Sequence, residues 1–86
     1  MFITLVAVLC HALAGMPEPV CVEEIVTDSA MDGRLTWMSC QIDAQAGIAA
    51  WLSDNPEYRN WTLARWKCVP GHYAIGKRAE IQGAAP

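Results

Sequence analysis

The sequence has little positive charge and lacks the short motifs by which many enzymes are recognised. Lys and Arg number 6 against 9 Asp and Glu in 86 residues, and the net charge is −3. This balance provides no basic surface for a nucleic-acid backbone. Patterns typical of phosphate-binding loops, dinucleotide-binding folds, serine hydrolases and zinc peptidases are also missing. We therefore expect no nucleic-acid partner, no cofactor, no metal and no catalytic residues, and a protein that is not an enzyme.

A membrane-spanning run is missing as well, because no apolar segment reaches the ~18 residues needed to cross a bilayer. The longest candidate, Phe2 to Ala14, is compatible with two interpretations. A cleaved export signal covering residues 1–14 would end at the small residues Ala12 and Ala14. A retained strand is favoured because no Lys or Arg precedes the run and β-branched residues are frequent in it. Cleavage would also leave an odd number of cysteines.

Turn residues separate this first strand from the next two elements. Pro17 and Pro19 predict a loop, and "VCVEEIVT" at 20–27 then predicts an edge strand. The neighbouring Glu23 and Glu24 should point to opposite faces of that strand and so cannot act as a catalytic pair. A turn at Asp32-Gly33 follows.

A helix is predicted from Trp37 to Ser53, with Thr36 or Ser39 as its N-cap. Pro56 marks its end. The last strand is "NWTLARWKCV" at 60–69, where residues alternate between two faces. The buried side of the helix should consist of four residues at helical spacing, with Gly47 allowing a close approach to the sheet: Cys40, Ala44, Ile48 and Trp51.

This order of elements predicts an α+β fold of the β-β-α-β type. We expect a small three-stranded antiparallel or mixed sheet in the order 2-1-3, with one helix packed on one face. The wholly apolar first strand belongs in the centre, where it is covered on both sides. Residues 1–70 should form one domain, and residues 71–86 a partly ordered tail.

Four cysteines are available to stabilise a core of this size, and no Cys-x-x-Cys pair occurs among them. A zinc ribbon and a thioredoxin-like couple are therefore disfavoured. In the predicted topology Cys10 and Cys21 flank the first loop, whereas Cys40 and Cys68 lie at the other end. The pairing Cys10–Cys21 and Cys40–Cys68 is thus favoured among the three possible connectivities. The alternative is a thiol-redox or metal-binding protein that uses Cys10, His11, Cys21 and Cys40.

One helix covers one face of a sheet, so the other face is a candidate interaction surface. Alternation along the last strand would turn Ala64, Trp66 and Cys68 toward the helix. The opposite face would then carry Trp61, Leu63, Arg65 and Lys67, beside Ile3, Leu5, Ala7 and Leu9 of the first strand. Aromatic residues and Arg are enriched in interfaces. One alternative is that the proline loop or the tail "YAIGKRAEI" folds over this face. The expected function is otherwise a small non-enzymatic module, stabilised by disulfides or thiols, that uses the face to bind an unknown protein or a second copy.

Two segments, "SCQIDAQAGIAAWLSDNP" and "YRNWTLARWKC", carry a resemblance that extends over roughly residues 2 to 68. The chain resembles a group of short four-cysteine bacterial proteins of unassigned function. The resemblance implies that the N-terminal run is a retained strand, and it implies no activity. Localisation follows the thiol chemistry: periplasmic or secreted if the cysteines are bridged or residues 1–14 are a signal, and otherwise cytoplasmic.

Overall fold

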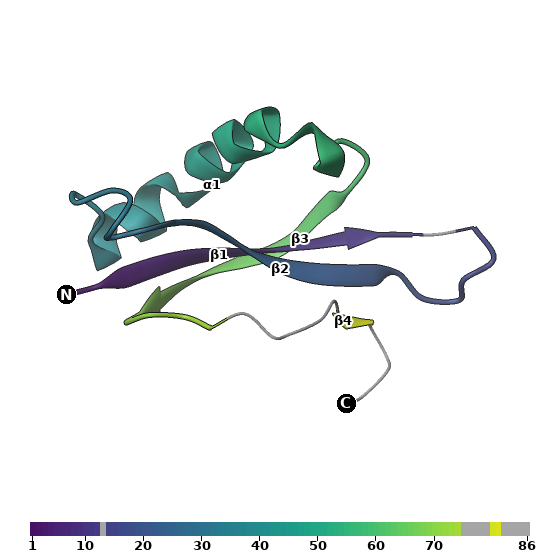
Figure 1. Cartoon of the computed structure of the whole chain (residues 1–86), viewed down its shortest axis with the longest axis horizontal. Coiled ribbons are helices and arrows are strands. Elements are labelled where there is room, and N and C mark those ends of the chain that lie inside the picture. Colours follow the sequence, from purple (N-terminus) through teal and green to yellow (C-terminus); the bar gives the residue numbers. More distant parts are fainter. Residues whose placement is uncertain (13, 75–79, 82–86) are drawn as a thin grey trace.

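The strands and the single long helix form two layers in the computed structural model, which describes residues 1–12, 14–74 and 80–81 (Figure 1). The sheet order is β3-β1-β2-β4, and every neighbouring pair is antiparallel. This confirms the β-β-α-β fold with strand order 2-1-3 and adds a two-residue strand at the edge of β2. Residues 75–79 and 82–86 of the expected tail lie outside the described residues. The elements are β1 (Ile3–His11), β2 (Val20–Asp28), α1 (Trp37–Asp54), η1 (Pro56–Tyr58), β3 (Thr62–Pro70) and β4 (Glu80–Ile81).

Strand β1 is buried on both of its faces. Every side chain from Ile3 to Leu9 is at most 3% exposed. The segment that could be interpreted as an export signal is therefore the central strand, to which both β2 and β3 are hydrogen-bonded. Its faces are the reverse of those expected. Ile3, Leu5 and Ala7 pack in one core with α1 and do not line the face away from it.

A bulge in β3 changes which of its residues face the helix. Val8 of β1 pairs with Arg65 and Leu9 pairs with Leu63, so Ala64 is an extra residue between them. Leu63 consequently packs against the core below α1, and Ala64 is exposed. The expected positions of both residues were wrong, because the alternation of a strand reverses at a bulge and its sequence gives no sign of one.

Helix α1 begins at a reciprocal cap. The Thr36 hydroxyl accepts a hydrogen bond of 3.1 Å from the Ser39 N–H, and the Ser39 hydroxyl accepts one of 2.9 Å from the Thr36 N–H. Thr36 is the N-cap, and Ser39 completes the box, so both predicted cap residues take part. The end at Asp54 precedes Pro56 as expected. Cys40, Ala44 and Ile48 are each 1% exposed, and Trp51 is partly buried on the same side.

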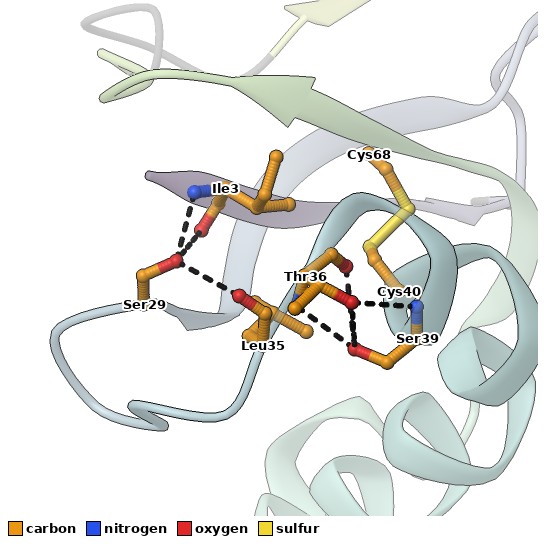
Figure 2. Close-up of a disulfide and its surroundings, with 7 residues drawn as sticks. All are labelled: Ile3, Ser29, Leu35, Thr36, Ser39, Cys40 and Cys68. Carbon is orange, nitrogen blue, oxygen red and sulfur yellow. Dashed lines mark hydrogen bonds between the residues drawn. A yellow bond between two sulfur atoms is a disulfide. The ribbon is translucent and has the colours of Figure 1, made fainter. Parts of the chain in front are cut away.

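Two disulfides, in the predicted pairing, join the layers and the strands. Cys40–Cys68 ties the first turn of α1 to β3 across 28 residues of sequence (Figure 2). Cys10–Cys21 joins residues directly opposite each other in β1 and β2, across 11 residues. Loop-closure entropy assigns about 3 to 4 kcal/mol to bridges of these spans.

A serine in the loop after β2 fastens the start of β1. The Ser29 hydroxyl accepts a 2.8 Å hydrogen bond from the Ile3 N–H and lies 3.4 Å from the carbonyl oxygens of Ile3 and Leu35 (Figure 2). This arrangement holds the residues that precede the Thr36 cap against the sheet. The helix therefore starts at a defined place above β1.

Replacing the glycine within the helix, Gly47, should make the protein more stable. A Cβ on Gly47 would meet the Leu5 side chain at 4.0 Å, which is ordinary van der Waals contact. Close approach does not require glycine here, contrary to our expectation. Gly47→Ala should raise the free energy of unfolding by about 0.5–1 kcal/mol, measured by urea titration, because glycine is a poor helix former. Ala46→Gly on the exposed side should cost a similar amount, and a destabilised Gly47→Ala would contradict the prediction.

Candidate functional site: the outer face of the helix

The four residues of the expected interaction surface do not form one patch. Leu63 packs against the core on the helix side. The Trp61 ring lies edge-on to Tyr58 at 5.2 Å and beside His11 at 5.1 Å between ring centroids. Arg65 and Lys67 pair with Val8 and Val6, whose side chains alternate with those of the helix-facing residues of β1. Only these two of the four thus belong to the face away from α1.

That face carries a polar network around Glu23. Lys67 Nζ lies 3.2 Å from one carboxylate oxygen of Glu23, and the Tyr73 hydroxyl donates to the other at 2.6 Å. Lys67 also donates to the Tyr73 hydroxyl at 3.0 Å. Beneath this network Val6 and Val8 are no more than 1% exposed. Among the described residues, the centre of this sheet face thus presents no exposed large apolar side chain.

The network changes the acidity of two of its members. Burial by itself would raise the pKa of Glu23, but hydrogen bonds from Tyr73 and Lys67 outweigh it and lower that pKa below 4.5. The hydrogen bond to Tyr73 raises the pKa of Lys67 against the opposing effect of burial, with a further contribution from Glu23. Both groups thus hold their charges more firmly in the folded chain.

Glu24 is directed to the helix side, as the predicted alternation with Glu23 requires. It pairs with Ala7 of the helix-facing core and accepts a hydrogen bond from the Tyr58 hydroxyl. Burial and this contact raise the pKa of Tyr58 to about 12. Trp51 stacks on Tyr58 with ring centroids 5.5 Å apart. These aromatic residues connect the end of α1 to β2 and β3, which is a structural role.

The residues of the thiol or metal alternative are not brought together. Cys10 and Cys21 are bonded to each other beside His11, whereas Cys40 is bonded to Cys68. All four sulfurs are thus occupied. In the part of the chain that the structure describes, no three His, Cys, Asp or Glu side chains are grouped so as to hold a metal ion.

A small pocket opens between the first half of α1 and the loop before it. It encloses about 200 Å³, below the roughly 300–1,000 Å³ of ordinary small-molecule sites. Its apolar wall includes Leu5, Leu35 and Gly47, and its polar wall includes Asp32, Arg34 and Asp43. A space of this size suits one side chain better than a cofactor. It lies on the flank of the helix.

The outer helix face is the most unusual surface of the described chain. It comprises the residues on the side of α1 away from the sheet, all of them exposed: Met38, Ile42, Gln45, Ala46, Ala49 and Ser53. Met38 is 70% and Ile42 is 72% exposed, and Trp37, which begins the helix beside them, is 47% exposed. A surface helix normally turns charged residues outward. Here Asp43 and Asp54 are the only charged residues of α1, and neither belongs to this face.

Sequence reasoning missed this surface, although its signal was present. The helical spacing of Cys40, Ala44 and Ile48 predicted the buried side of α1, and these three residues are indeed buried. The opposite side of the same segment has neither Lys, Arg nor Glu. An outward side without charge indicates a covered or interacting helix. The exposed candidate site could therefore have been found before the fold was known.

Comparison with family models, curated proteins and solved structures found no significant match. The resemblance to short four-cysteine bacterial proteins therefore stays a prediction. Among the described residues, no helix has both the length and the apolar character needed to cross a membrane. The geometry of the outer helix face is thus the basis for assigning a function.

The Glu23 network predicts a specific dependence of stability on pH. Because folding lowers the pKa of Glu23 below 4.5, its contribution is complete above that pH and disappears as the pH falls through the folded-state value. Glu23→Gln should therefore destabilise the protein at neutral pH, and the difference from wild type should shrink in acid. Urea midpoints across this pH range measure the effect. Glu18→Gln, in an exposed loop, is the control, and a difference that is constant with pH would refute the prediction.

Proposed function

We propose that this protein is a non-enzymatic interaction module that binds a protein surface through the outer helix face. The observation that carries the proposal is the exposure of Met38 and Ile42, at 70% and 72%, on a helix side without charge. Burying large apolar side chains gives about 1.5–3 kcal/mol each, so these two residues supply a strong driving force for association. The low cost of ordering a preformed helix supports the same conclusion.

The scaffold suits a module of this kind. The Cys40–Cys68 bridge and the capping box hold the first turn of α1, which carries Met38, against the sheet. The presented surface is thereby preorganised before it meets a partner. Disulfides persist in oxidising compartments, so the proposed site of action is the periplasm or the cell exterior.

The sheet face away from α1 is a weaker candidate for the same function. Its central valines are buried, and Lys67 is already paired with Glu23 within the chain. Arg65 is exposed on this face and could take part at the rim of a contact. This face thus lacks the apolar centre that interfaces need.

Photo-crosslinking tests the proposed function. A benzophenone side chain at position 42 should give one discrete protein adduct in cells of the source organism. The same group at position 65 should give at least about fivefold less, because that face has no apolar centre. Adding Met38→Asp to the benzophenone-bearing chain should abolish the adduct, because a charge on the outer helix face opposes its burial in any contact. Equal yields from the two positions, or no adduct from position 42, would refute the proposal.

The thiol or metal alternative makes the opposite prediction about the cysteines. The protein should show an intact mass four hydrogens below that of the reduced chain, since two disulfides are formed. A thiol reagent should label no cysteine without denaturant, and no bound metal should be found by elemental analysis. Labelling of Cys10 or Cys40 in the native protein would support a reactive-thiol function in place of the interaction module.

A further inference from the structure

We infer that the surface bound by the outer helix face is the same face of a second copy, in an antiparallel helix pair; this rests on the proposed function. The first half of the face is bulky, with Met38 and Ile42, and the second half is small, with Ala46, Ala49 and Ser53. A two-fold axis near the centre of the helix turns one half onto the other. The face is therefore complementary in shape to itself.

The spacing of residues on the outer helix face, together with their sizes, indicates how the two helices are aligned in the pair. Met38, Ile42, Gln45 and Ala49 are separated by four, three and four residues, the period of a seam between two packed helices. An axis between Gln45 and Ala46 places Ile42 of one copy opposite Ala49 of the other. Met38 then lies opposite Ser53. Each bulky side chain meets a small one, which allows the helices to approach closely.

The charges of the helix agree with this orientation. The first turn of α1 contains no acidic residue, and the last turn contains no basic one. Asp54 lies instead at the last position, where the partial negative charge of the helix end disfavours it. In an antiparallel pair, Asp54 of one copy lies near the positive N-terminal end of the other. A parallel pair would place the two Asp54 residues, and the negative ends of both helices, at the same end.

The size of the contact defines the conditions of the test. An 18-residue helix is about 27 Å long, so one helix pair falls among small interfaces, below about 1,200 Å² in total. Such contacts are typically weak and transient. The dimer should therefore form reversibly, and protein concentrations from about 10 μM to about 1 mM are appropriate for affinities of this class.

The experiment exchanges the two side chains, at positions 42 and 49, that meet across the seam, and it measures dimer formation. Sedimentation equilibrium of the full chain should show a monomer–dimer equilibrium. Ile42→Ala and Ala49→Ile should each raise the dissociation constant at least about tenfold, the first by removing apolar contact and the second by opposing two bulky residues. The double variant I42A/A49I restores one bulky and one small residue at each pair, so its constant should return to within about threefold of wild type. Ala50→Ile, on the flank of the helix, is the matched control and should change little.

The possible results separate this inference from the proposed function. A wild-type chain that stays monomeric throughout the concentration range, or a double variant as weak as the single ones, overturns the inference. A position-42 adduct with the mass of two chains supports it. An adduct with a different protein overturns the second-copy inference while supporting the interaction module. Circular dichroism of each variant establishes that a loss of dimer is not a loss of fold.

Discussion

The burial of β1 on both faces is the constraint on which the remaining structure depends. Seven consecutive side chains, from Ile3 to Leu9, are almost completely removed from water. A strand of this kind must be central, since an edge position would leave its backbone groups unpaired and its side chains wet. Strands β2 and β3 therefore flank it on either side, and α1 covers one of the two faces.

A chain of 86 residues has few elements with which to cover its apolar surfaces. This explains why the outer helix face stays exposed. The helix buries one side against β1, and Tyr73 takes part in closing the other face of the sheet. No further element of the described chain lies on the outer helix face. Its exposure costs stability in an isolated domain, whereas a self-complementary partner recovers the same apolar area. The disulfides compensate for a core that is small for its length.

Strand β2 shows how two adjacent acidic residues can contribute to different faces of one sheet. Glu23 is held by Lys67 and Tyr73 on one side, and Glu24 by Tyr58 on the other. Both carboxylates thereby have hydrogen-bond donors inside the protein. A partly buried carboxylate without such partners would be costly. The two contacts also connect segments that are distant in sequence, since Tyr58 belongs to η1 after the helix and Tyr73 follows β3.

Local patterns in the sequence determined the strand order, the helix with its Thr36 cap and the pairing of Cys40 with Cys68, because these follow from periodicity, capping chemistry and chain length between elements. Tertiary structure alone decided which face each strand residue occupies. The extra residue Ala64 reverses the alternation in β3, and packing against α1 selects Leu5 over Val6. When a strand is apolar on both faces, its sequence does not indicate which face the helix will cover. That choice depends on contacts between segments far apart in the chain.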